Sequence, residues 1–187
     1  MATAKPQKDV HIPSWTLNNF IRRQFGKPHR YDSEIIQGQV VADLGCGPGF
    51  FTFPLADRVG PTGKVYAVDS DPKAIRVIER KAAKGNYQHI ETHAGSAAKL
   101  DFITDGSVDF VLADGLLCCV APQDHTEVVN EIKRVLKSEA KAYLVSGRSN
   151  LTYMNDSEWE VILKEFNVLK RNHPPYKGDR WAWVKKL

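Results

Sequence analysis

Residues 40–50 read VVADLGCGPGF, an apolar run that passes directly into a loop with a glycine at every second position. This short apolar run with its two valines predicts a buried strand over 39–44, which Gly45 ends. Glycine permits positive φ angles and lets backbone N–H groups approach a ligand closely, because it carries no Cβ. A helix is expected to follow over 50–59, and its N-terminus would favour a carboxylate or another negative group of a ligand.

The spacing of these glycines separates the loop from two better-known nucleotide-binding loops. It is G-x-G-x-G, whereas a dinucleotide-binding loop requires G-x-G-x-x-G, and the position of that third glycine holds Phe50. A P-loop ends in Gly-Lys followed by Ser or Thr, and this ending is absent. Asp69 lies 20 residues after Gly49, at the end of the next expected strand (64–68), where a carboxylate can bind ribose hydroxyls. The pattern favours a ligand that contains a nucleoside, and the alternative is a glycine turn with a structural role only.

The rest of the chain alternates between apolar runs of strand length and amphipathic helices. Further strands are expected at 89–91, 108–113 and 141–145, further helices at 15–25, 72–84, 123–136 and 159–166, and two short strands around Val168 and over 181–184. This alternation is typical of a doubly wound, Rossmann-like α/β sheet, mostly parallel, with an antiparallel C-terminal hairpin at its edge. Ligands of such sheets bind at the carboxyl ends of the strands, so the segments that follow the strands should meet at one rim. These segments are 45–49, Asp69, 95–96 and 114–119.

Length and composition predict a single domain over 1–187, with a flexible stretch at 1–13 and an N-terminal helical or lid segment at 14–38. The balance of 26 basic against 22 acidic residues, a net charge of +4, is too even for a dedicated nucleic-acid binder. Three cysteines without metal-ligand spacing argue against a disulfide framework and a zinc site, and favour a reducing, cytoplasmic location. No apolar stretch reaches the roughly 18 residues of a membrane span.

Five stretches, in this order along the chain, resemble the motifs of class I S-adenosylmethionine-dependent methyltransferases. They are 43–49, which resembles motif I of that family, and 65–69, 95–100, 108–114 and 131–137, which look like the stretches that follow it. The last of them is similar to the helix end of the small-molecule, methyltransferase type 11-like branch. The resemblance covers most of the chain, and it implies a methyltransferase with a Rossmann-like fold and S-adenosyl-L-methionine as its cofactor.

The resemblance also implies which residues hold that cofactor. They are Asp43, Gly45, Cys46, Gly47, Asp69, Ser70, Gly95, Ser96 and Asp114. The family pattern places Asp43 and the first two glycines at the methionine part, Asp69 at the ribose, and Ser70 and Ser96 at the adenine. Two positions depart from the pattern: Ser96 stands where Asp is common, and 137–140 stand where Pro-Gly-Gly is common. The first change weakens the expected contact with the adenine amino group, because a hydroxyl is a neutral acceptor, and the second affects a turn.

The residue that assists methyl transfer stays open. The candidates are Asp114, Cys118, Cys119, His29 and Tyr31. Asp114 follows the fourth strand, where it orients an acceptor, contacts the cofactor or caps a loop. The adjacent thiols Cys118 and Cys119 bind a soft metal, a metalloid or a thiol substrate, or else they are buried apolar side chains, the commoner role of free cysteine. His29 and Tyr31 precede the first strand and serve as a base, as a wall of the acceptor pocket or, more commonly, as surface residues.

The C-terminal part carries two patterns that are found in enzymes acting on bases. Residues 172–176 are similar to the N-P-P-Y signature of methyltransferases that act on amino groups of bases. His173 interrupts the signature, and the stretch follows the fifth strand instead of the fourth, so a hairpin loop is expected. Arg180, Trp181 and Trp183 form either a stacking platform for bases or a strand with one packed face, and their alternation with smaller apolar residues favours the strand.

The sequence therefore predicts an enzyme that transfers a methyl group from S-adenosylmethionine to a small-molecule acceptor of open identity. The alternatives are an RNA or protein methyltransferase, and a non-catalytic S-adenosylmethionine-binding protein. A small-molecule substrate is the expected partner, nucleic acid and metal are not expected, and the oligomeric state is left open.

Overall fold

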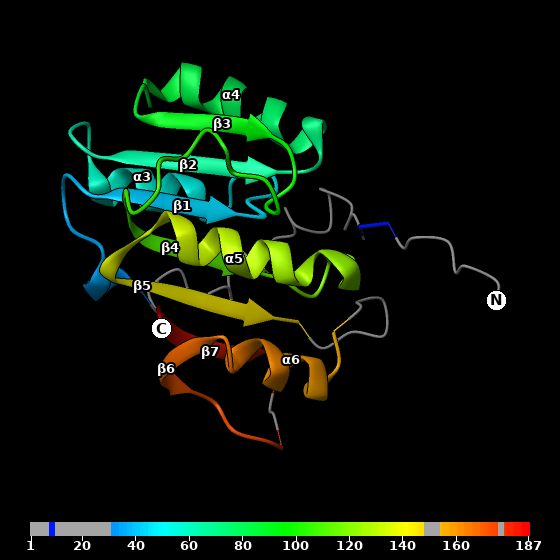
Figure 1. Cartoon of the computed structure of the whole chain (residues 1–187). Helices are drawn as coiled ribbons and strands as arrows, with labels where there is room; N and C mark the ends of the chain where they lie inside the picture. Colours follow the sequence, from blue (N-terminus) through cyan, green and yellow to red (C-terminus); the bar gives the residue numbers. More distant parts are fainter. Residues whose placement is uncertain (1–7, 10–30, 148–153, 176–177) are drawn as a thin grey trace.

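The computed structural model describes residues 8–9, 31–147, 154–175 and 178–187 (Figure 1). Its helices and 3-10 turns are η2 (Asp32–Glu34), α3 (Thr52–Val59), α4 (Pro72–Gly85), η3 (Pro122–Asp124), α5 (His125–Val135) and α6 (Asp156–Leu163). Its strands are β1 (Val40–Leu44), β2 (Lys64–Asp69), β3 (Ile90–Ala94), β4 (Val108–Asp114), β5 (Leu136–Ser146), β6 (Phe166–Arg171) and β7 (Arg180–Lys186). The helix predicted over 15–25 lies outside the described residues.

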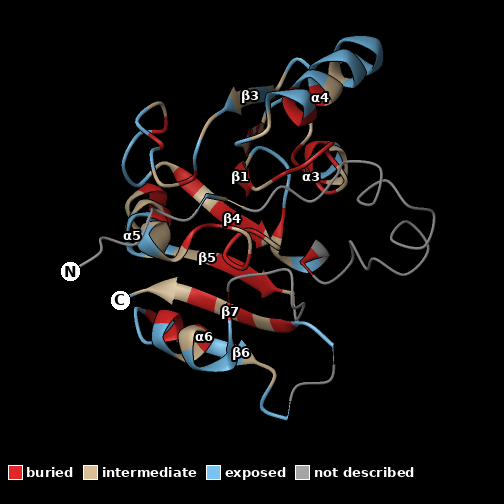
Figure 2. Ribbon diagram, turned by 90° about the vertical axis from the view of Figure 1, so that its right-hand side faces the viewer, coloured by how far each residue is buried: buried red, intermediate tan, exposed pale blue. Residues whose placement is uncertain are grey.

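The strands form one mixed sheet in the order β3-β2-β1-β4-β5-β7-β6. The strands β1 to β5 pair in parallel, and β7 runs antiparallel between β5 and the edge strand β6. The helices α3 and α4 cover one face of the sheet and α5 and α6 cover the other (Figure 2). Because helices shield both faces, the central strands β1 and β4 are almost entirely buried, which explains their continuous apolar sequences. The predicted doubly wound fold with an antiparallel C-terminal hairpin at the edge is confirmed.

Strand β3 is longer than its sequence indicates. The pattern predicts a strand over 89–91, whereas β3 continues to Ala94, and its residues 92–94 pair in parallel register with the last three residues of β2. No residue of β3 is fully buried, as is common for a strand at the edge of a sheet, and three of its central residues are polar or charged. The extension brings the turn at 95–96 level with the carboxyl end of β2.

Strand β5 begins directly after α5, where the sequence pattern predicts a helix to Leu136 and a turn over 137–140. Leu136 is instead the first residue of β5 and pairs with the start of β4. Lys137 forms an ion pair with Asp109 of β4 at 2.5 Å, and Glu139 forms one with Lys185 of β7 at 2.7 Å. These contacts with both neighbouring strands hold the stretch in an extended form, and the expected turn is wrong.

The connection between β3 and β4 (95–107) contains no helix in the structure as described, and it is fixed to α5 instead. Arg134 of α5 donates hydrogen bonds to the carbonyl oxygens of Leu100 and Ile103, at 2.9 and 2.8 Å. Glu131 accepts the N–H of Leu100 at 2.6 Å and also pairs with Arg134 at 2.7 Å. Stretch 131–137, which carries part of the family resemblance, therefore positions a loop that leads to the carboxyl rim of the sheet.

All described strands belong to one sheet, in line with the single domain predicted over 1–187, which stays a prediction. Within the described ranges, no helix has the length and apolar character needed to cross a membrane.

Candidate functional site

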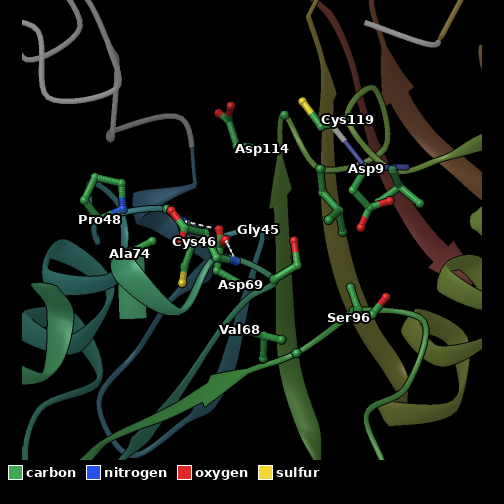
Figure 3. A pocket seen from close by; sticks show the side chains of 18 of the residues that line it. Asp9, Gly45, Cys46, Pro48, Val68, Asp69, Ala74, Ser96, Asp114 and Cys119 are labelled. Atoms are coloured by element: carbon green, nitrogen blue, oxygen red, sulfur yellow. Dashed lines mark hydrogen bonds between the residues drawn. The ribbon is translucent and has the colours of Figure 1, made fainter. Parts of the chain in front are cut away.

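A cavity lies at the carboxyl ends of β1, β2, β3 and β4, where the loops that follow these strands meet (Figure 3). Its lining consists of 45–48, 50–51, 68–71, 95–97, 114–116 and 119–120, together with Asp9 and Ala74. Four segments that are far apart in the sequence thus form one site. The prediction that they meet at a single rim is confirmed.

The glycine loop presents backbone to the cavity. The φ angles are +74° at Gly45, +52° at Gly47 and +88° at Gly49, values that residues with a side chain rarely adopt. A Cβ at Gly45 would lie 3.2 Å from the Cβ of Leu116 on the facing loop, so a larger residue would press into the opposite wall. The N–H of Gly45 donates to the carbonyl of Val68 at 2.8 Å and ties the loop to the end of β2.

Asp69 ends β2, and the backbone holds both oxygens of its carboxylate. Oδ2 accepts the N–H of Gly47 at 2.7 Å, and Oδ1 accepts the N–H of Asp71 at 2.8 Å (Figure 3). Asp71 in turn is the N-cap of α4, since its side chain accepts the N–H of Lys73 at 2.8 Å. Each oxygen of Asp69 keeps a second lone pair, so the fixed carboxylate can accept hydrogen bonds from two neighbouring hydroxyls.

Asp43 and Cys46 support the glycine loop from within. Asp43 is 2% exposed and accepts a hydrogen bond from Oγ1 of Thr52 at 2.7 Å, at the start of α3. It does not line the cavity, so its expected contact with the cofactor stays a prediction. Cys46 lines the cavity while packing into a small core cluster with residues of β2 and α4. Burial and the negative charges of Asp43 and Asp69 raise the pKa of the Cys46 thiol, which keeps it protonated.

The turn after β3 contributes Gly95 and Ser96, while Ser70 follows β2 on the adjoining wall. The N–H of Gly95 donates to the carbonyl of Asp69 at 3.0 Å, so the two turns are joined. Oγ of Ser96 accepts the N–H of Ala98 at 3.1 Å, which uses one of the two lone pairs of the hydroxyl. The hydroxyl of Ser96 therefore holds its own turn in place and keeps one lone pair for a ligand in the cavity.

The loop after β4 brings a carboxylate beside an aromatic wall. Asp114 is the last residue of β4, and its side chain shares a sheet face with Leu112, two residues earlier. Leu112 packs in the same core cluster as Phe51, which lines the cavity together with Phe50. The rings of Phe50 and Phe51 meet edge to face, with 4.7 Å between their centroids. This side of the cavity is thus largely apolar, with Asp114 at its rim.

The two adjacent thiols occupy different environments. Cys118 is buried, and its Sγ donates to the carbonyl of Gly115 at 3.3 Å, whereas Cys119 lines the cavity. The two sulfur atoms lie 4.0 Å apart. A hydrogen bond from Cys119 lowers the pKa of Cys118 to about 7, and the same contact, with burial, raises the pKa of Cys119 above its ordinary value.

In the part of the chain that the structure covers, no group of three His, Cys, Asp or Glu side chains could hold a metal ion.

Asp9 is a cavity residue that the sequence analysis does not identify. Its Oδ1 accepts the N–H of Ala121 at 3.0 Å and so joins positions 112 residues apart. The residue belongs to a polar stretch for which the sequence predicts flexibility (1–13), and no periodicity or motif marks it. The position of Asp9 in the cavity wall is known only from its contact with the loop after β4.

The charge of the cavity is opposite in sign to that of the chain. Its walls carry the carboxylates of Asp9, Asp69, Asp71 and Asp114, and no lysine, arginine or histidine among the described residues lines it. The chain as a whole has a net charge of +4. The cavity therefore favours a cationic ligand, such as a sulfonium with an ammonium group, over a polyanion.

Of the two remaining candidates, the structure describes only Tyr31. His29 is outside the described residues. Tyr31 is 2% exposed, and its ring packs against Phe51 at 6.0 Å and Phe110 at 5.9 Å, so the surface interpretation is wrong for this residue. Tyr31 does not line the cavity itself but lies behind Phe51, which does.

The C-terminal patterns are structural. Residues 172–175 follow β6 in the connection to β7, which confirms the hairpin loop for these residues, and Tyr176 lies outside the described residues. Trp181 and Trp183 are half-buried on β7, alternate with fully buried smaller residues, and pack against Tyr143 of the neighbouring strand β5. The strand interpretation is thus confirmed.

Known proteins resemble this chain in sequence and in fold. A family model described as a methyltransferase domain matches residues 41–139. A demethylmenaquinone methyltransferase from Lactobacillus johnsonii is 31% identical over an alignment that covers 86% of this chain and 70% of that protein. A protein of the same name from Lactococcus lactis is 36% identical over 79% of this chain, which spans 54% of that protein. The crystal structure of an S-adenosylmethionine-dependent methyltransferase from Aquifex aeolicus superimposes with a TM-score of 0.71 at 24% identity, covering 91% of this chain and 96% of that one.

Proposed function

This chain belongs to the methyltransferase domain family and is a class I S-adenosylmethionine-dependent methyltransferase, and we propose that its acceptor is a small, largely apolar molecule. The observation that carries the proposal is the composition of the cavity wall, in which aromatic side chains and carboxylates meet without a basic side chain among the described residues. The two similar proteins from Lactobacillus and Lactococcus have names that specify demethylmenaquinone, a small molecule, which supports the same class of acceptor.

The residues present fit the cofactor, which supplies an electrophilic methyl group on a sulfonium when it is bound. Asp69 would accept hydrogen bonds from the two ribose hydroxyls, because both of its oxygens are held in place and keep a free lone pair. The backbone at Gly45 and Gly47 would lie along the methionine part, where positive φ angles leave no Cβ in the way. Ser70 and Ser96 would then lie beside the adenine.

The acceptor would lie on the side of Phe50, Phe51 and Asp114. Methyl transfer is an in-line displacement, so the acceptor atom must approach opposite the bond from methyl carbon to sulfur, and a rigid apolar wall favours that geometry. Apolar walls also exclude water from the reacting atoms. As the new bond forms and the carbon–sulfur bond breaks, an O–H or N–H acceptor loses a proton, and Asp114 is the carboxylate placed to orient that group and take the proton.

Cys119 is less suited to the role of base. Its hydrogen bond with Cys118 and its burial raise the pKa of the Cys119 thiol, so it stays protonated at neutral pH. Asp114 is therefore the better candidate for proton transfer, and Cys119 contributes an uncharged side chain to the cavity wall.

Turnover on a defined set of acceptors tests this proposal. The protein is incubated with S-adenosylmethionine and small hydroxylated or quinol-type aromatics, a structured RNA or a peptide, and S-adenosylhomocysteine is measured by mass spectrometry. We expect turnover on small aromatics, and Asp114→Asn should lower kcat while leaving the Kd of S-adenosylhomocysteine nearly unchanged. The matched control is Asp101→Asn, which removes the same charge from an exposed loop position. Turnover on RNA or peptide alone would contradict the proposal.

A further inference from the structure

Asp9 is the cavity residue that comes from the N-terminal part of the described chain. Its Oδ1 accepts the N–H of Ala121, which directly follows the last cavity residue of the β4 loop, Val120. Figure 3 shows Asp9 on the side of Ser96 and Cys119, away from Pro48 and Ala74. Asp9 is thus held on the β3–β4 side of the cavity and faces the glycine loop across it.

The carboxylate of Asp9 has an oxygen to offer a ligand. Among the hydrogen bonds of the described residues, Asp9 takes part through Oδ1 alone, which leaves Oδ2 without a partner there. The backbone N–H of Ala121 fixes the direction of the carboxyl group, so Oδ2 has a defined position. An ionised carboxylate accepts hydrogen bonds only, so the group that meets it must be a donor.

Two further acceptors that line the cavity, Ser96 and Asp71, each make a hydrogen bond of their own. Oγ of Ser96 accepts the N–H of Ala98, and as a neutral hydroxyl it binds a donor about half as strongly as a carboxylate does. Asp71 accepts the N–H of Lys73 as the cap of α4. Asp69 is assigned to the ribose and Asp114 to the acceptor, whereas Asp9 lies on the side of Ser96, toward which the base would extend.

We propose that Asp9 accepts a hydrogen bond from the exocyclic amino group of the adenine. The inference rests on the cofactor placement of the proposed function, with the ribose at Asp69 and the ring extending toward Ser96. An adenine directs an N–H donor at Oδ2, whereas a hypoxanthine has a carbonyl oxygen at the same ring position and would place two acceptors face to face. Asp9 therefore makes the site specific for adenine, and the N-terminal part of the chain completes the cofactor site.

The test compares two ligands that differ at ring positions 1 and 6, where hypoxanthine has an N–H and a carbonyl in place of the bare nitrogen and the amino group of adenine. S-adenosylhomocysteine and S-inosylhomocysteine are titrated into the wild-type protein, Asp9→Asn and Asp9→Ala by calorimetry. The wild type should prefer the adenine ligand by about tenfold or more, the usual effect of a hydrogen bond to a charged group. Asp9→Asn keeps an oxygen for Ala121 and adds an N–H donor, so it should lose most of the preference, and Asp9→Ala should lose it as well. The control Asp101→Asn should keep the wild-type ratio.

The ratio of the two dissociation constants decides the inference. An equal preference in the wild type and the Asp9 variants overturns it, and so does a wild type that binds both ligands equally. A change in acceptor KM with an unaltered ratio would assign Asp9 to the acceptor and also overturns it. Because no acceptor is present in the titration, failure of the small-molecule proposal appears only in the turnover assay, so the two failures are distinguishable. Thermal unfolding of each variant shows whether it is folded.

Discussion

Replacing Asp69 by Asn should weaken cofactor binding while nearly preserving the shape of the site. The two oxygens of Asp69 accept the N–H groups of Gly47 at 2.7 Å and Asp71 at 2.8 Å. An amide of the same size offers one oxygen and one NH2 group, so one of these backbone donors would face another donor. The ribose diol would also lose one of its two acceptors, together with the negative charge.

The size of the effect follows from these contacts. A hydrogen bond to a charged group contributes about 1.5–3 kcal/mol net, so losing one bond to the ribose should raise the Kd roughly 10- to 150-fold. The backbone N–H that faces the amide should lower the free energy of unfolding of the ligand-free protein by about 1–3 kcal/mol. Both effects are expected in the same variant, but they are measured separately.

Calorimetric titration with S-adenosylhomocysteine measures the binding effect in the wild type, Asp69→Asn and the charge control Asp101→Asn. The side chain of Asp101 is 73% exposed, so its replacement should change neither Kd nor stability appreciably. Urea unfolding gives the stability of each variant. A folded Asp69→Asn protein whose Kd rises less than about threefold would refute the reasoning, because the ribose would then not lie at this carboxylate.

Three further predictions concern the framework of the site. Gly49→Ala should lower the free energy of unfolding by about 2–4 kcal/mol, because φ is +88° and the new Cβ would lie 2.8 Å from an aromatic ring. Gly106→Ala is the control, since Gly106 also has a positive φ but has open space around it, and it should lower the free energy of unfolding by about 1 kcal/mol. Equal losses for the two variants in urea unfolding would contradict this prediction. The guanidinium of Arg134 lowers the pKa of Glu131 in the folded protein. The ionised Glu131 therefore stabilises the fold above its unfolded pKa of about 4.3, and this contribution is lost as the pH falls through the folded pKa. Glu131→Gln should therefore be about 1–3 kcal/mol less stable at neutral pH and converge with the wild type in acid, and a constant difference across pH would exclude the ionic cause. Cys119→Ala should raise the pKa of Cys118 from about 7, since it removes the hydrogen bond to the thiolate, and a titration of thiolate ultraviolet absorbance that does not move would speak against the pairing.

The glycine loop and Asp69 can be predicted from the sequence because their signals are local. An apolar run that ends in closely spaced glycines is typical of a strand followed by a tight loop, and glycine is the residue type that permits the positive φ found at Gly45 and Gly47. The distance along the chain to Asp69 then follows from the length of one helix and one strand. The cap of α4 at Asp71 is equally local, because it depends on neighbours two residues away.

The extent of β5 and the burial of Tyr31 depend on neighbours that the sequence does not reveal. Leu136 belongs to a strand because it pairs with Val108 at the start of β4, although its own stretch continues an amphipathic helical pattern. Tyr31 has no helical or strand periodicity around it, and its burial arises from the rings of Phe51, which directly precedes α3, and Phe110 of β4. In both cases tertiary packing outweighs the local preference.

Local pattern thus establishes the alternation of strands and helices, the glycine loop and the carboxylate that follows it, because backbone preferences depend on residues a few positions apart. The meeting of Asp9 with Ala121, and the choice of Cys119 over Cys118 as a cavity residue, follow from the folded chain. Contacts across 112 residues form only when the packing of the whole sheet offsets the entropy of closing so long a loop, and no short stretch of sequence contains that information.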